Sequence, residues 1–176
     1  MDIISSTAPK SLTSDTNFSN YLLIVNAYSI IPKLYGMDNI TTGEVMDKLD
    51  MFKSRFGKID QFGWWDLERI SADAGTQFAS TESKDECQTR GVCLTLAAPE
   101  RQEMNRKVEV PRRMLPTVAH SCIVHARVPE VYVYFALMYT KDHIFPVLPI
   151  KDIISEDDDP TTPHTLATGM KPSVSH

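Results

Sequence analysis

Residues 108–140 read VEVPRRMLPTVAHSCIVHARVPEVYVYFALMYT, and the expected fold class depends on this stretch. Its second half is rich in valine, isoleucine, tyrosine and phenylalanine, which favour β-strands. Two strands are therefore predicted, over 121–128 and 131–140, with a break at Pro129 and Glu130. Apolar residues occupy both alternating sets in the second strand, so both of its faces are covered or one is an interaction face. The two strands together predict a bent hairpin.

The segment upstream of this stretch changes to helical periodicity. Thr41, followed three residues later by Glu44, is a capping-box pattern that predicts the start of a helix. Apolar residues then recur at spacings of four and three, which places them on one helical face. They are Val45, Leu49, Phe52, Phe56 and Ile59. Gly57 marks the expected end of this helix.

The remaining elements follow from local composition and from the positions of proline and glycine. They are a buried strand over 21–31, a second helix over 61–74, a loop over 76–90, a short strand over 91–98 and an irregular charged segment over 100–116. We therefore predict an α+β fold: a mostly antiparallel sheet with the two central helices packed on one face. Residues 1–20 are expected to be a flexible N-terminal arm, 21–154 a single domain and 155–176 a disordered acidic tail.

Composition narrows the class of protein. A chain of 176 residues with 42% hydrophobic residues is long enough to bury a core. Its net charge of −5 argues against a general nucleic-acid binder, which is usually basic. No stretch approaches the roughly 20 apolar residues of a membrane-spanning helix. Three cysteines and no signal-peptide pattern predict a soluble intracellular protein.

No sequence motif predicts catalysis. The chain lacks G-x-S-x-G, a phosphate-binding glycine loop and H-E-x-x-H. No pair of carboxylates stands in an apolar context that would raise one pKa. We therefore expect a protein that is not an enzyme and has no cofactor.

A metal site is a weaker alternative to buried free cysteines. Cys87 and Cys93, together with His120, Cys122 and His125, offer thiolate and imidazole ligands. The five residues between Cys87 and Cys93 exceed the usual zinc spacing. On a strand, His120 and Cys122 would point to one face and His125 to the other. The prediction is therefore no metal.

The aromatic residues of the last predicted strand have two interpretations. Tyr132, Tyr134, Phe135 and Tyr139 could stack on bases of a single strand. In surfaces that bind single strands, lysine or arginine usually lies among the aromatic residues, and neither occurs between Val128 and Thr140. A packed core or a protein-binding face is the preferred interpretation.

A basic segment precedes the predicted hairpin. It consists of Arg101, Arg106, Lys107, Arg112 and Arg113. Pro111 and Pro116 are expected to hold its end extended, so that the last two arginines project into solvent. Each such charge contributes about 1 kcal/mol near an anionic membrane, which gives weak contacts that multiply through avidity. A solvated loop of mixed charge is the alternative.

The order of elements resembles that of the matrix proteins of plant-infecting, cytorhabdovirus-like rhabdoviruses. It rests on NYLLIVNAYSIIPKLYG leading into TTGEVMDKLDMFKSRFGKIDQFGWWDLERI, and on VPRRMLPTVAHSCIVHARVPEVYVYFALMYT near the end. The resemblance implies a structural virion protein that self-assembles, condenses the ribonucleoprotein core and bridges it to the envelope during budding. The implied partners are other copies of the chain, the nucleocapsid protein, the glycoprotein and anionic membrane, with no sequence-specific nucleic acid.

The resemblance also places expected contacts on residues of this chain. The basic segment would contact membrane or nucleocapsid, and self-assembly would use Phe18, Tyr21, Tyr132 and Tyr134. The expected location is the virion, beneath the envelope, and the host cytoplasm and internal membranes. A small viral regulatory module, such as an RNA-silencing suppressor or a host-protein adaptor, is the alternative function.

Overall fold

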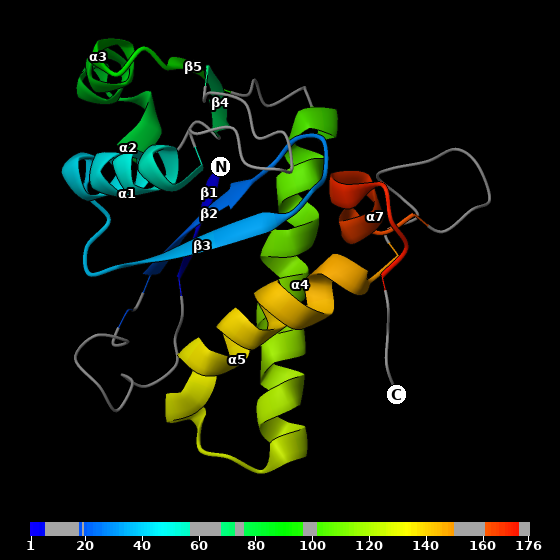
Figure 1. Ribbon diagram of the computed structural model, residues 1–176. Coiled ribbons are helices and arrows are strands. Elements are labelled where there is room, and N and C mark those ends of the chain that lie inside the picture. The colour runs from blue at the N-terminus through cyan, green and yellow to red at the C-terminus, as the bar shows by residue number, and fades with distance from the viewer. Residues whose placement is uncertain are drawn as a thin grey trace.

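The computed structural model describes residues 1–5, 18, 20–56, 68–72, 76–96, 102–149 and 161–172. It is an α+β protein, as predicted, with one three-stranded and one two-stranded sheet among its helices (Figure 1). None of the helices in these ranges combines the length and apolar character needed to cross a bilayer.

Three antiparallel strands make the first sheet, in the order β1–β2–β3. Strand β1 is Asp2–Ser5, β2 is Asn20–Val25 and β3 is Pro32–Met37. The predicted strand over 21–31 therefore ends early, in a turn that leads to β3. The start of the predicted flexible arm is ordered as β1, because pairing with β2 satisfies its main-chain groups. Residues 6–17 and 19 lie outside the described residues.

The central strand β2 faces a hydrophobic core on each side. Side chains alternate across a strand. Leu22 and Ile24 belong to one buried cluster, and Tyr21 and Leu23 belong to the other. The sheet is therefore covered on both faces, whereas the sequence predicted helices on one face only.

Helix α1, Thr42–Phe56, covers the first face and confirms the predicted helix. The hydroxyl of Thr41 accepts a hydrogen bond from the backbone N–H of Glu44 at 3.3 Å, as a capping residue does. The Glu44 carboxylate accepts from the N–H groups of Asp38 and Asn39 at 2.7 and 2.8 Å. The glutamate thus orders the turn that enters the helix.

The second sheet consists of two parallel strands, β4, Arg69–Ala72, and β5, Cys93–Leu96. Strand β5 lies within the predicted strand over 91–98. Strand β4 falls where a helix over 61–74 was predicted, and that prediction is wrong for 69–72. Residues 61–67 and 73–75 lie outside the described residues. Pairing with the parallel strand β5 decides the conformation of 69–72. The residues of β4 by themselves do not indicate this partner.

Two helices connect β4 to β5, in a segment predicted to be a loop. They are α2, Thr76–Ala79, and α3, Thr81–Thr89. Ser80 caps α3, and its hydroxyl accepts from the N–H of Ser83 at 3.1 Å. Parallel strands require such a crossover connection.

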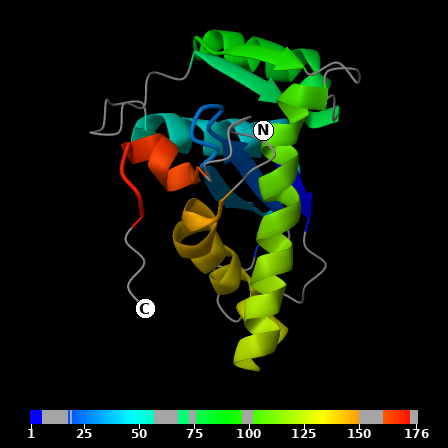
Figure 2. The same cartoon turned by 90° about the vertical axis from the view of Figure 1, so that its right-hand side faces the viewer.

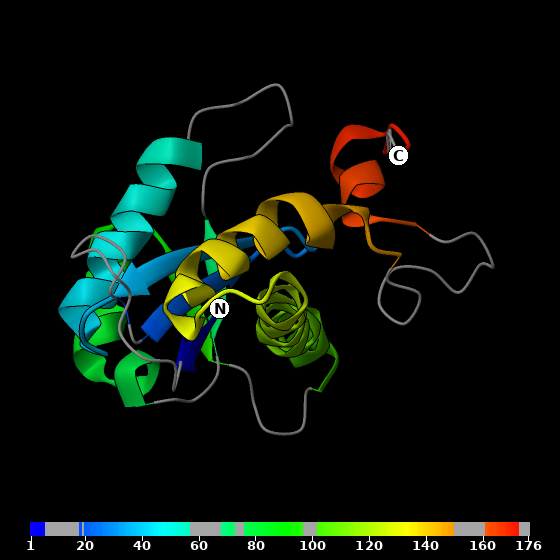
Figure 3. The ribbon, with the colours of Figure 1, turned by 90° about the horizontal axis from the view of Figure 1, so that it is seen from below.

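The second face of the first sheet is covered by helices that replace the predicted hairpin. Helix α4 is Gln102–Ala126, the 3-10 turn η2 is Glu130–Tyr132 and α5 is Val133–Tyr139. A π-helical turn η3, Thr140–Ile144, and a 3-10 turn η4, Phe145–Val147, continue from α5. Seen from below, α4 is viewed nearly along its axis with α5 lying across it (Figure 3). The predictions of strands over 121–128 and 131–140 are wrong.

The helical conformation of α4 follows from what it packs against. Leu115, Ala119 and Ile123 are buried and are spaced by four residues, so they form one helical face. Leu115 and Ala119 share a buried cluster with β2 and α5. Pro111 and Pro116 lie inside the helix instead of holding an extended segment. A helix-interior proline costs about 3 kcal/mol, and tertiary packing offsets this cost here.

Helix α7, Pro163–Thr168, lies within the predicted disordered tail. The hydroxyl of Thr162 caps it by accepting from the N–H of Thr165 at 3.1 Å. Gly169, at φ 71°, ends it in the left-handed conformation that favours glycine. Residues 150–160 and 173–176 lie outside the described residues.

Candidate functional site

The two sheets meet where β1 lies beside β4. The backbone nitrogen of Met1 donates a hydrogen bond to the carbonyl of Ser71 at 2.7 Å. Ile3 and Ile70 share one buried cluster. Helix α4 contacts both β1 and β2, and its beginning lies toward the same end of the molecule as β4 and β5 (Figures 1 and 2). One end of the fold therefore gathers β1, β4 and the start of α4.

Acidic residues occupy backbone positions on two of these elements, and a third acidic residue directly follows β4 in the sequence. Asp2 is the first residue of β1 and pairs with Leu23. Glu103 is the second residue of α4. Asp73 directly follows β4 in the sequence and lies outside the described residues. We name these three residues the acidic set.

Sequence reasoning missed the acidic set. The predicted helix over 61–74 hid strand β4, so Asp73 was not recognised as a residue that follows a strand. The predicted flexible arm hid β1 and with it Asp2. The signal available was one aspartate beside each of two short strand segments, Asp2 at the start of DIIS and Asp73 directly after RISA.

The basic segment has a different form from the predicted extended one. Arg112 and Arg113 are exposed on α4, and Arg112 lies 3.7 Å from the carboxylate of Glu109. Lys107 donates a hydrogen bond to the carbonyl of Ala27 at 2.8 Å, so it also holds the β2–β3 turn. Arg101 and the side chain of Arg106 lie outside the described residues.

Three of the four residues expected to mediate self-assembly pack against one another, Tyr21 buried and Phe18 and Tyr134 partly buried. Tyr21 is 1% exposed, and its ring centroid lies 6.5 Å from that of Tyr134. The ring of Phe18 lies 6.2 Å from that of Tyr134. Burial, and then the neighbouring Tyr134, raises the pKa of Tyr21 to about 12. Of the four, Tyr132 alone belongs to the exposed class, at 40%.

Three of the exposed aromatic residues lie on one face around α5. Tyr132, Phe135 and Tyr139 are 40%, 49% and 55% exposed. Their spacing of three and four places them along one side of the helical turn and α5. The exposed aromatic residues therefore follow helical spacing, and not the alternation of side chains that was predicted for a strand.

The cysteine and histidine candidates are split among three elements, α3, α4 and β5, where Cys93 is exposed. Cys87 is buried in α3, with its thiol 3.9 Å from the sulfur of Met46. His120, Cys122 and His125 line a shallow hollow on α4, where the helix brings the last two to one side. Within the described ranges, no three His, Cys, Asp or Glu side chains form a group that could hold a metal ion.

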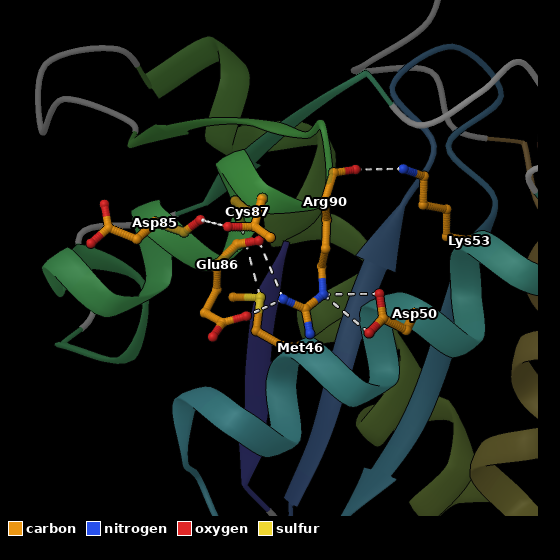
Figure 4. A network of polar contacts seen from close by, with 8 residues as sticks. Met46, Asp50, Lys53, Asp85, Glu86, Cys87 and Arg90 are labelled. Atoms are coloured by element: carbon orange, nitrogen blue, oxygen red, sulfur yellow. Dashed lines mark hydrogen bonds and ion pairs between the residues drawn. The ribbon is translucent and has the colours of Figure 1, made fainter.

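A charged cluster joins α1 to α3 near β5 (Figure 4). The Arg90 guanidinium donates to both carboxylate oxygens of Asp50 at 3.0 Å and also pairs with Glu86. Lys53 donates to the Arg90 carbonyl at 2.7 Å. Hydrogen bonds to Glu86 and Asp50 raise the pKa of Arg90. The charges satisfy one another, so this cluster holds the fold together.

Burial raises the pKa of the Cys87 thiol, while the positive charge of Arg90 opposes that shift. A buried thiol with a raised pKa carries little thiolate at neutral pH. Cys87 is therefore a core residue and a poor nucleophile.

Comparisons with known proteins identify the fold. No family model matches the chain, and no curated protein matches it. A chain of the simian T-cell lymphotropic virus intasome, solved in complex with the PP2A regulatory subunit B56 gamma, aligns with a TM-score of 0.61 at 16% identity. The alignment covers 99% of this chain and 57% of that one, so this chain spans little more than half of the intasome chain.

Two catalytic core domains are similar over most of their lengths. The BIV integrase core aligns with a TM-score of 0.57 at 13% identity, covering 85% of this chain and 86% of that one. The HTLV-2 integrase core, solved in complex with magnesium, aligns with a TM-score of 0.54 at 14% identity, covering 94% and 95%. These likenesses have no bearing on the matrix-protein resemblance. The expectation that the chain is not an enzyme stays a prediction, because the structurally similar proteins are enzymes. The chain has the fold of the retroviral integrase catalytic core.

Proposed function

We propose that this chain is the catalytic core of an integrase-type enzyme that acts on the phosphodiester backbone of a polynucleotide with magnesium. One observation carries the proposal: the fold is that of integrase cores, and Asp2 and Glu103 lie on two of the elements that meet at one end, while Asp73 directly follows the third, β4, in the sequence. Asp2 stands on β1, Asp73 follows β4 and Glu103 stands in the first turn of α4.

The donor set suits magnesium. Two aspartates and one glutamate offer only carboxylate oxygens, which are the hard ligands that this ion prefers. The residues that would hold it are Asp2, Asp73 and Glu103. When bound between carboxylates, magnesium activates an attacking oxygen and stabilises the leaving one.

Two arginines of α4 would bind the substrate, and the buried clusters would hold the metal ligands in place. Arg112 and Arg113 are exposed on α4, the helix that carries Glu103 in its first turn, and they provide positive charge for phosphates in an otherwise acidic protein. The two cores on either side of β2 hold β1 and α4 in fixed relation, which an arrangement of metal ligands requires.

Magnesium binding and cleavage test the proposal together. Isothermal titration calorimetry would show saturable magnesium binding by the full chain, and a labelled duplex would be cut only when magnesium is present. Asp2→Asn and Glu103→Gln should each lower both binding and product by at least about 100-fold, because each removes one charged ligand.

Glu82→Gln is the control, an exposed glutamate on α3. It should keep wild-type binding and product. Thermal melting of every variant checks that it is folded. A wild-type chain that binds no magnesium, or an Asp2→Asn chain that still cuts, would show the proposal to be wrong.

The matrix protein remains a second candidate function. The exposed stripe of Tyr132, Phe135 and Tyr139 supports it, because apolar side chains in solvent favour association with another surface. Sedimentation with nucleocapsids and light scattering over a concentration series test it, and a monomer at all concentrations that pellets with nothing would exclude it. The regulatory-module alternative predicts tight binding of short RNA duplexes at physiological salt.

A further inference from the structure

The tip of the β2–β3 hairpin, residues 26–31, is attached to the beginning of α4. The Lys107 ammonium donates a hydrogen bond to the carbonyl of Ala27 at 2.8 Å. Lys107 follows Glu103 by four residues, which is about one helical turn or roughly 6 Å along the axis. The hairpin tip therefore lies next to the first turns of α4, the helix that carries Glu103.

Hydrogen bonds fix the conformation of this tip. The side-chain oxygen of Asn26 accepts from the N–H groups of Tyr28 at 2.9 Å and Ser29 at 2.8 Å. The main chain of Asn26 accepts from the N–H of Ile30 at 2.9 Å and donates to the carbonyl of Ile31 at 3.2 Å. Asparagine stabilises turns in this way.

A buried side chain anchors the other end of the tip. Ile30 has φ 59°, a left-handed conformation that is unfavourable for a β-branched residue. Its side chain is 1% exposed, in the cluster that contains Leu115 of α4 and Leu137 of α5. Burial of Ile30 offsets the backbone strain, so the tip is held in one position.

Tyr28 projects from this fixed tip into solvent. It is 74% exposed, the highest value among the large apolar residues that are described and exposed. The exposed aromatic residues of α5 neighbour one another, with Tyr132 and Phe135 rings 6.2 Å apart. Tyr28 has no ring partner within the described part of the chain. Single exposed apolar residues are common, but this one is held rigidly beside a candidate site.

We infer that Tyr28 stacks on an unpaired nucleobase of a polynucleotide that lies along the beginning of α4. This inference rests on the proposed function. A tyrosine on a rigid turn loses little conformational entropy when it binds, and stacking on an aromatic ring accepts any base. The ligand class is a strand end with unpaired bases, because a base within a closed duplex offers no free face.

Fluorescence anisotropy tests this contact. The probe is a labelled duplex with a five-nucleotide single-stranded overhang, and calcium replaces magnesium so that no cleavage follows binding. Tyr28→Ala should raise Kd by roughly 5- to 150-fold. Tyr28→Phe keeps the ring and should change Kd by less than about twofold, and Tyr139→Ala, an exposed tyrosine on α5, should do the same.

The outcomes separate the inference from the proposed function. Wild-type binding with an unchanged Kd for Tyr28→Ala would overturn the inference and leave the integrase-type function standing. Equal losses in Tyr28→Phe and Tyr28→Ala would assign the contact to the hydroxyl and would also overturn stacking. Failure of the wild-type chain to bind any oligonucleotide would reject both. A photo-cross-link from 5-iodouracil in the overhang, mapped to Tyr28 by mass spectrometry, would support the inference independently of variant folding.

Discussion

Gly36 and Phe18 show how one missing side chain fixes the edge of the sheet. The ring of Phe18 lies where a Cβ at Gly36 would stand, so only glycine permits this contact. The same ring packs against Tyr134 of α5. The absence of a side chain at Gly36 therefore lets Phe18 pack between β3 and α5.

We predict opposite effects for alanine at two glycines. Gly36→Ala should lower the free energy of unfolding by about 1–3 kcal/mol, because its Cβ would displace the Phe18 ring. Gly43→Ala, in α1 with nothing within 4 Å, should raise it by up to about 1 kcal/mol through helix propensity. Urea denaturation measures both. A Gly36→Ala protein as stable as the wild type would contradict the packing of Phe18.

At the scale of the element, α4 illustrates the conflict between local preference and tertiary packing. The second half of α4 contains several β-branched residues, and two prolines, Pro111 and Pro116, lie inside the helix. The four-residue spacing of Leu115, Ala119 and Ile123 nevertheless matches one helical face, and this face is buried. Packing against β2 and α5 stabilises the helix more than its own residues do.

Two neighbouring positions of α4 test this interpretation. Ile123 is 5% exposed and Val124 is 61% exposed. Adjacent residues can differ in this way when a helix buries only one face. Ile123→Ala should lower the free energy of unfolding by about 2–4 kcal/mol. Val124→Ala should change it by less than about 0.5 kcal/mol. On a strand buried on both faces the two substitutions would cost similar amounts, and that result in denaturant titrations would contradict the helix.

At the scale of the whole molecule, the net charge of −5 opposes polyanion binding, while α4 presents arginines locally. Binding to a polynucleotide or an anionic membrane should therefore be weak and sensitive to salt. The two proposed functions differ in the surface that this helix contacts.

Replacing Arg112 and Arg113 together by glutamine should reduce the slope of log K against log salt for a duplex by about 1.8, since each phosphate contact contributes about 0.9. Lys84→Gln, an exposed cation on α3, is the control and should leave the slope nearly unchanged. Anisotropy from 50 to 200 mM NaCl measures the slopes. An unaltered slope, combined with loss of pelleting on anionic liposomes, would instead favour the membrane contacts of a matrix protein.

The sequence by itself determined the α+β class, helix α1 and strand β5. Each rests on information within a few residues: the capping residue Thr41, the apolar spacing of Val45, Leu49 and Phe52, or a short apolar run that ends at a proline. Local hydrogen bonds and periodic burial suffice to specify such elements.

Only the tertiary structure decided the remaining elements. Strand β1 needs β2 as a partner, β4 needs β5, and residues 121–139 become helical because the buried face of α4 meets the sheet. The acidic set likewise depends on elements far apart in sequence, since β1, β4 and α4 meet only after folding. Strand pairing and helix docking join segments that are far apart in sequence. The local sequence pattern of one segment therefore does not indicate the partner whose contacts stabilise it.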